Sequence, residues 1–436
     1  MLVQDFLQQS AERLPNKVAL ICNDKRLTYA EIEAHANRLA NSMIDHGVKR
    51  GDRVVIYMDN SVELVVSIFA TLKAGGVFVV GNPTTKSEKL AYILNNCSAT
   101  ALVAELCNFS LVSEVLESTR TLKFSILSDS NTSRVKIDSA SIYGQVEMLD
   151  LNDILWTYSD QRPPRVNIDL DLACLIYASN TSDEPKGLMS DHNNMLFTVS
   201  SIIEYLGNTG DDIVINTLPL SSEYGLYQLF TVFKFGGTLV LERPFSNPEA
   251  ILKLIEQEQV TGFPGIPTTF STLLEMDLSS HDLSSLRYFT DSGAALPPDH
   301  TNRMREVFPR VSLYIVYGLT ETKLMLYLPP DQIDERPDSF GIPIPGTEAW
   351  IEDESGNHLG PGETGELVVR GRHVMRGYWK DPETTSIHYR PGYYPGERVC
   401  YTGESFRMDK DGYFYIVNSR SDVKPYLGDK VIQRSS

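Results

Sequence analysis

The 436-residue sequence lacks several features that define whole classes of protein. It has no run of about eighteen apolar residues and no apolar signal core at its start, so we expect no membrane span and a cytoplasmic setting. Basic clusters are absent and the formal net charge is −18, which argues against nucleic-acid binding. The five cysteines form no close pairs, which disfavours a metal knuckle or a disulfide framework.

What the sequence does contain is an alternation of helical and strand patterns. "TYAEIEAHANRLANSMIDHG" begins with Thr28 and Glu31 at capping-box spacing and predicts a helix that ends at Gly47. Short apolar runs follow, among them "DRVVIYM" and "VFVV", and they predict parallel βαβ units. The stretch from about 103 to 166 is poorer in pattern, and we expect its Trp156 to be a buried support.

Changes in the pattern of apolar and polar residues divide the chain into three approximate parts. A second α/β series begins at "LACLIY", and from about residue 341 apolar and polar residues alternate between Gly, Pro and Asn turns, which predicts an antiparallel β unit. We therefore expect subdomains at approximately 1–170, 171–340 and 341–420.

A loop rich in hydroxyl groups follows the apolar run "LACLIY". This loop, "YASNTSDEPKG", carries Ser179, Thr181, Ser182 and Lys186, and a helical pattern begins shortly after it. We expect the loop to join the carboxyl end of a buried strand to that helix, which is where open α/β sheets bind ligands. Hydroxyl donors and one lysine suit phosphate, but a solvent-exposed loop of turn formers is an equally good interpretation of these residues alone.

The loop resembles the phosphate-loop motif of the adenylate-forming (ANL) superfamily, which comprises acyl- and aryl-CoA ligases, peptide-synthetase adenylation domains and luciferases. "YGLTET" (317–322) is identical to a second family motif. "DSGAALP", "GELVVRGRHVMRGYW" and "YTGESFRMDKDGYFYIVNSRSD" resemble others, in the family's order, up to about Asp422. The resemblance implies an α/β fold in which helices sandwich two parallel-rich sheets, with a smaller antiparallel, β-barrel-like subdomain. It also implies one large adenylation domain over residues 1–420.

The resemblance also implies roles for individual residues, with ATP and Mg²⁺ as cofactors. The catalytic residues would be Lys186, Thr320 and Glu321, with Thr320 at the α-phosphate and Glu321 on the magnesium ion. The remaining nucleotide contacts would come from the phosphate loop, the adenine site and the ribose site: Ser179, Thr181, Ser182, Lys186, Gly293, Ala294, Ala295, Tyr317, Gly318, Glu404 and Arg420.

This sequence departs from the family pattern at several of these positions. Asn180 and Asp183 stand where glycine is usual, Glu404 replaces an aspartate, and Ser419 replaces a glycine, which predicts altered or weak use of ATP. The family hinge is expected at Asp422, so residues 421–436 would begin a further C-terminal domain, without which activity would be impaired.

The segment "EYGLYQL" bears on the acid substrate. Glu223 falls where peptide-synthetase domains carry the aspartate that pairs with a substrate ammonium, and the segment resembles ligases that load proline onto carrier proteins. Tyr224 would lie beside it, and Phe263, Gly265 and Ile266 in "GFPGIPTTF" would form another pocket wall. Glu223 could instead turn outward or cap a helix, and "GFPGIPTTF" could be a turn that supports the sheet.

We therefore expect ATP-dependent adenylation of a small amino or imino acid. The acyl group would pass to a carrier-protein phosphopantetheine or a CoA thiol. The alternatives are an acyl- or aryl-CoA ligase and a non-catalytic nucleotide-binding relative.

Overall fold

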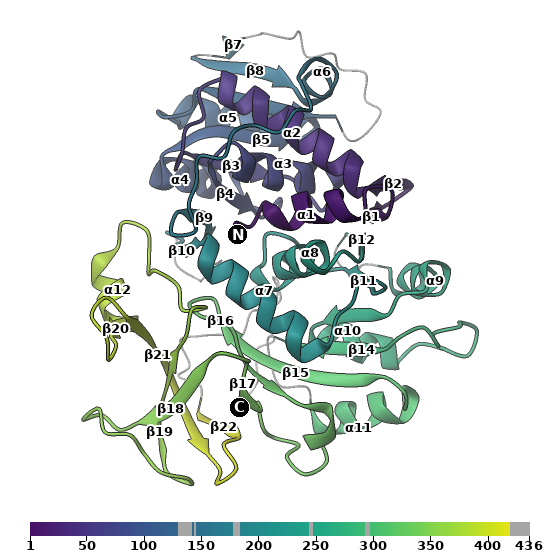
Figure 1. The fold of residues 1–436 in the computed structure, drawn as a ribbon, viewed down its shortest axis with the longest axis vertical. Coiled ribbons are helices and arrows are strands. Elements are labelled where there is room, and N and C mark those ends of the chain that lie inside the picture. The colour runs from purple at the N-terminus through teal and green to yellow at the C-terminus, as the bar shows by residue number, and fades with distance from the viewer. Residues whose placement is uncertain (130–141, 144, 178–183, 244–246, 293–296, 419–436) are drawn as a thin grey trace.

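The computed structural model describes residues 1–436 except 130–141, 144, 178–183, 244–246, 293–296 and 419–436. Two large mixed sheets with helices on both faces form most of the molecule, and a smaller antiparallel sheet packs beside the second of them (Figure 1). Among the helices that the structure describes, none combines the length and apolar character needed to span a bilayer.

Within the described residues the first sheet has eight strands, and its inner strands pair in parallel. Its central strands are apolar and buried on both faces: all seven residues of the strand at 99–105 are buried. Antiparallel strands close the two edges. In spatial order the strands are β10 (Gly187–Asp191), β9 (Leu172–Tyr177), β4 (Val77–Gly81), β3 (Arg53–Tyr57), β5 (Ala99–Glu105), β6 (Phe124–Ser128), β8 (Val146–Asp150) and β7 (Ile142–Tyr143).

The second sheet has nine strands in the part of the chain that the structure describes, and five of its neighbouring strand pairs are parallel. The two sheets exchange segments, because the strands nearest the N-terminus join this second sheet whereas β9 and β10 belong to the first. In spatial order the strands are β17 (Ile342–Pro343), β16 (Lys323–Leu328), β15 (Ser312–Leu319), β14 (Tyr288–Asp291), β13 (Gly262–Gly265), β11 (Ile213–Asn216), β12 (Thr238–Leu241), β1 (Val18–Cys22) and β2 (Lys25–Thr28).

Helices pack in three layers around these sheets. One apolar core joins the facing sides of both sheets through the helices that lie between them. Two further apolar cores lie on the outer faces of the sheets. The helix at 29–45 begins with the predicted capping box of Thr28 and Glu31. The helices are α1 (Asp5–Arg13), α2 (Tyr29–Asp45), α3 (Val62–Lys73), α4 (Ser87–Cys97), α5 (Phe109–Ser118), α6 (Leu151–Thr157), α7 (His192–Leu206), α8 (Glu223–Phe235), α9 (Pro248–Glu258), α10 (Pro267–Leu274), α11 (Pro298–Val307) and α12 (Pro382–His388).

The third sheet is antiparallel, as its alternating sequence predicts. Its described strands form an open sheet rather than a closed barrel, with β22 pairing on β21 outside the main order. The strands are β18 (Glu348–Glu352), β19 (Thr364–Arg370), β21 (Arg398–Met408), β20 (Tyr389–Pro391) and β22 (Phe414–Asn418).

Two expectations about local structure were wrong. The loop after β9 does not lead directly into a helix, because β10 intervenes and folds back antiparallel on β9 before α7 begins. Trp156 is 88% exposed, because the short helix α6 buries Leu151 and Ile154 on its inner side and leaves the indole outside.

Candidate functional site

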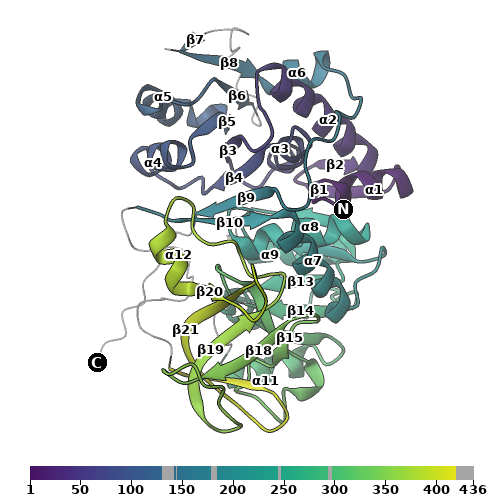
Figure 2. The ribbon, with the colours of Figure 1, turned by 60° about the vertical axis from the view of Figure 1, so that its left-hand side comes forward.

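The edge strand β10 brings a distant segment of the chain to the candidate phosphate loop. The Met189 N–H donates to the Gly377 carbonyl at 2.9 Å, and the Trp379 N–H donates to the Gly187 carbonyl at 2.7 Å. These bonds seat α12 and its preceding turn against β10, as Figure 2 shows. The segment between β19 and β20 of the antiparallel unit therefore lies beside the end of the loop.

Of the phosphate contacts predicted in the loop, Lys186 is the one that lies among the described residues. Its Nζ lies 2.7 Å from Asp381 Oδ2 and donates to Thr384 Oγ1 at 2.5 Å. The lysine ammonium holds the pKa of the Asp381 carboxyl at about 2. The lysine side chain is about half exposed, so this ion pair contributes little to stability and can be exchanged for a phosphate.

Glu321 lies in the tight turn between β15 and β16, together with Thr320, which is half-buried. Gly318 permits this hairpin, since a Cβ at that position would lie 1.9 Å from the Lys323 carbonyl oxygen. The Tyr378 hydroxyl donates to Glu321 Oε1 at 2.6 Å, and the Tyr389 hydroxyl donates to the Glu321 carbonyl at 2.9 Å.

Tyr378 joins these two parts into a single site. The Lys186 Nζ lies 5.9 Å from the centroid of the Tyr378 ring, whose hydroxyl contacts Glu321. The structure therefore brings Lys186 and Glu321 together, although 135 positions separate them in the sequence (321 − 186).

Two further candidates hold polar atoms that find no partner in the described part of the chain. The Tyr317 ring lies against Phe340 and Phe406, with centroids 4.7 and 5.3 Å away, and its hydroxyl oxygen is buried and unbonded. Glu404 is 5% exposed and its Oε2 is also unbonded, and burial raises the pKa of its carboxyl to about 7. Unpaired buried atoms of this kind suit the hydroxyl groups and base of a nucleotide.

Glu223 begins α8 and turns inward. Ser222 caps the helix by accepting from the Gly225 N–H, so Glu223 is not the cap. Its Oε1 is buried with no hydrogen bond to any described residue, and burial raises the pKa of its carboxyl well above the usual value. The Tyr224 hydroxyl donates to the Thr290 carbonyl at 2.9 Å, which fixes the first turn of α8 against β14.

The candidates in "GFPGIPTTF" separate into core and edge. Phe263 is fully buried, and its ring lies 6.1 Å from that of Phe270 and 6.2 Å from that of Phe289, so it belongs to the core beneath the sheet. Gly265 also packs against this core, since a Cβ at that position would lie 2.8 Å from the Phe270 ring. Ile266 lies at the edge: it is half-buried and is the first residue beyond β13.

Several predicted residues lie outside the described residues. They come from the phosphate loop, the adenine segment and the expected hinge: Ser179, Asn180, Thr181, Ser182, Asp183, Gly293, Ala294, Ala295, Ser419, Arg420 and Asp422.

Sequence reasoning missed three residues of this region. Tyr378 stands in the quoted "MRGYW", and Asp291 opens "DSGAALP" with both carboxylate oxygens buried and unbonded among the described residues. Lys323 directly follows "YGLTET", yet it is 2% exposed and its Nζ donates to Ser190 Oγ at 2.7 Å. Proximity to a quoted motif was the only available signal for each of them.

The described residues contain no group of three histidine, cysteine, aspartate or glutamate side chains able to hold a metal ion by themselves. A single carboxylate such as Glu321 nevertheless fits magnesium, which in nucleotide sites is held by one or two carboxylates and the phosphates.

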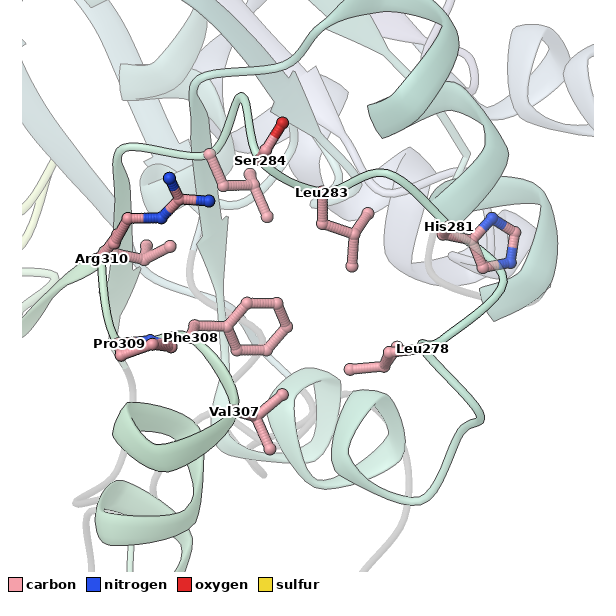
Figure 3. Close-up of a pocket in the computed structure, with 10 residues that line it drawn as sticks. Leu278, His281, Leu283, Ser284, Val307, Phe308, Pro309 and Arg310 are labelled. Carbon is pink, nitrogen blue, oxygen red and sulfur yellow. The ribbon is translucent and has the colours of Figure 1, made fainter.

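A pocket of about 220 Å³ lies elsewhere, at the C-terminal end of α11, and is drawn in Figure 3. Apolar side chains line it together with His281, Ser284 and Arg310, and it contains none of the residues described above.

Comparison with known proteins agrees with this geometry. Residues 7–379 match the AMP-binding enzyme family. The chain belongs to this family. It is an AMP-forming, ATP-using ligase, and the predicted family and sandwich fold are confirmed.

The family's members differ in the acids they use. A long-chain-fatty-acid–CoA ligase of Bacillus subtilis (strain 168) is 28% identical over 97% of this chain and 77% of its own length. Gramicidin S synthase 2 of Brevibacillus brevis is also 28% identical over 97% of this chain, which spans only 9% of that protein. The crystal structure of VinN matches with a TM-score of 0.81 and 30% identity, over 96% of this chain and 99% of that one.

Proposed function

We propose that this AMP-forming ligase activates a small amino acid. The observation that carries the proposal is the inward carboxylate of Glu223, whose Oε1 is buried without a hydrogen bond from any described residue. A buried carboxylate is costly unless a cation pairs with it, and a substrate ammonium supplies that cation. A second structure of VinN, in complex with L-aspartate, matches this chain with 29% identity and a TM-score of 0.80. That complex supports an amino-acid substrate in this fold.

The reaction joins the substrate carboxylate to the α-phosphorus of ATP and releases pyrophosphate. In this proposal Lys186 binds the β- and γ-phosphates, and Thr320 donates to the α-phosphate, so that the attacking oxygen and the leaving group lie in line. Mg²⁺, held by Glu321 and the phosphates, would neutralise charge on the leaving pyrophosphate. Glu404 would accept from the ribose hydroxyls, and Tyr317 would lie against the base.

A thiol sulfur then attacks the acyl carbon of the acyl-adenylate, which forms a thioester and releases AMP and the thiol proton. We propose the phosphopantetheine of a carrier protein, as in nonribosomal peptide synthesis, with the CoA thiol as the alternative acceptor. The similarity to the Bacillus ligase along nearly the whole chain favours acyl-CoA synthesis as the second candidate function.

Acid-dependent exchange of labelled pyrophosphate into ATP tests the proposal on the full chain. Exchange that depends on an amino acid supports it, whereas exchange only with fatty or aryl acids supports the second candidate. ATP binding without exchange across a broad panel of acids would show a non-catalytic relative.

A further inference from the structure

We propose that Lys323 binds a second acidic group of the substrate, so that the preferred acid is an amino dicarboxylate. This inference rests on the proposed role of Glu223 and extends it, because the two residues together would define a site for a zwitterion with an additional negative charge.

The position of Lys323 is unusual for a lysine. It is the first residue of β16, directly after the turn that holds Glu321, and its side chain is only 2% exposed. Its backbone has a φ of +62°, a left-handed conformation that residues with a Cβ adopt at some cost. A buried ammonium on strained backbone beside a reaction site is a costly arrangement that points to a function for the charge.

The ammonium lies on the same face of α8 as Glu223. The Lys323 Nζ is 5.4 Å from the centroid of the Tyr227 ring, and Tyr227 follows Glu223 by one helical turn. The two charges influence each other, since Lys323 opposes the rise in the pKa of Glu223 that burial causes. They nevertheless form no ion pair, although both are described residues.

The other polar neighbours of Lys323 have partners of their own or carry no charge. Ser190 Oγ accepts one of the three ammonium hydrogens. Asp191 caps α7 through the Asn194 N–H at 2.7 Å and pairs with Arg376 Nε at 2.6 Å.

Two further neighbours are neutral. Burial raises the pKa of the Cys174 thiol to about 12 and lowers the pKa of His373 to about 3, so neither is ionised near pH 7.

Lys323 and Glu223 therefore present opposite charges that the protein does not join directly. A substrate ammonium on Glu223 and a substrate carboxylate on Lys323 would satisfy both, while a second carboxylate faces Thr320 and Glu321 for adenylation. A monocarboxylic amino acid would leave the lysine without an anion, which costs affinity for such substrates.

Pyrophosphate exchange on the full chain with L-aspartate, L-asparagine, L-alanine and L-proline tests this inference. Asparagine matches aspartate in size but lacks the second charge. We expect exchange with aspartate to exceed that with asparagine at least 10-fold in kcat/KM. Lys323→Met should remove this preference by raising the KM for aspartate at least 10-fold, with little change for asparagine.

Lys234→Met is the matched control. Lys234 is also partly buried, and burial lowers the pKa of its ammonium to about 8, but it contacts Ser200 and the Phe6 ring rather than the site. If Lys323→Met does not fold by thermal unfolding, Lys323→Gln and the wild-type ratio of aspartate to asparagine still decide the question.

Equal use of asparagine, alanine or proline, unchanged in Lys323→Met, would overturn the role of Lys323 and leave the amino-acid proposal intact. Exchange only with acids that lack an amine, or with no acid, would overturn both.

Discussion

Replacing Glu223 with glutamine separates a substrate-binding carboxylate from a structural one. Burial raises the pKa of this carboxyl well above its usual value, and its Oε1 has no hydrogen bond to any described residue. Glutamine has nearly the same shape and no charge. We therefore expect the free energy of unfolding of Glu223→Gln to stay within about 1 kcal/mol of wild type.

Activity should respond very differently. Removing one member of a buried ion pair costs about 3–5 kcal/mol, and each ~1.4 kcal/mol is tenfold in kcat/KM, so amino-acid-dependent exchange should fall by roughly 10²–10⁴. The loss should appear with every substrate that carries an amine. ATP binding, measured by calorimetry or by competition with a fluorescent nucleotide, should remain as in wild type because Glu223 has no proposed contact with the nucleotide.

Glu105→Gln is the appropriate control. Glu105 is also a buried carboxyl whose pKa burial raises, but it lies on β5 in the first sheet and contacts Cys107. If Glu223→Gln lowered the melting temperature strongly and reduced exchange with amine-free acids to the same extent, Glu223 would be a structural partner of Lys323. Unchanged use of amino acids would refute the amine assignment directly.

Three further substitutions test other parts of the site. Tyr378→Phe removes the 2.6 Å hydrogen bond to Glu321, and hydrogen bonds to charged groups contribute roughly 1.5–3 kcal/mol. We therefore expect the exchange rate to fall about 10-fold and the Mg²⁺ concentration needed for half-maximal exchange to rise. An unchanged Mg²⁺ dependence would contradict this role of Tyr378. Folding raises the pKa of the Glu404 carboxyl from 4.5 to about 7, so between these pH values the folded state binds more protons than the unfolded state. The free energy of unfolding should therefore fall as the pH rises through this range, by roughly 1–2 kcal/mol after solvent screening. Glu404→Gln should reduce that fall, as measured by melting curves at pH 5 and 7.5. Gly318→Ala places a Cβ against the Lys323 carbonyl and should destabilise the protein by about 2 kcal/mol or more in denaturant titrations. Gly210→Ala is the control, because a Cβ at Gly210 would come no closer than 3.8 Å to a neighbouring atom, and it should change the stability much less.

The sequence predicted the elements whose signals are local. The capping box at Thr28 and Glu31 and the apolar spacing after it fix α2 without help from distant residues. β10 escaped detection because Gly187–Asp191 has no strand-like alternation. Its Leu188 forms a β-bridge with Tyr378, 190 positions away (378 − 188), and such long-range contacts leave no local pattern.

Residues of the site could be predicted only where they belong to a motif of the family. Lys186 and Glu321 came from the family resemblance, and the structure brings them to one tyrosine. Lys323 was missed because lysine is almost always exposed, so a buried one contradicts the default expectation. Phe263 was placed in a pocket wall on the basis of its motif, but the aromatic contacts that hold it in the core come from separate elements.

The site combines two kinds of charged group, and the difference decides what each can control. Lys186 is about half exposed and already paired with Asp381, so exchanging that partner for a phosphate costs little, and its contribution to ATP affinity is correspondingly modest. Glu223 Oε1 and the Lys323 side chain are buried, and neither is fully paired within the described protein. Their desolvation is offset only by a ligand of matching charge, so a substrate that lacks either charge loses binding energy that nothing else in the pocket restores. Selection among acids should therefore depend on this buried pair rather than on the exposed lysine that contacts phosphate.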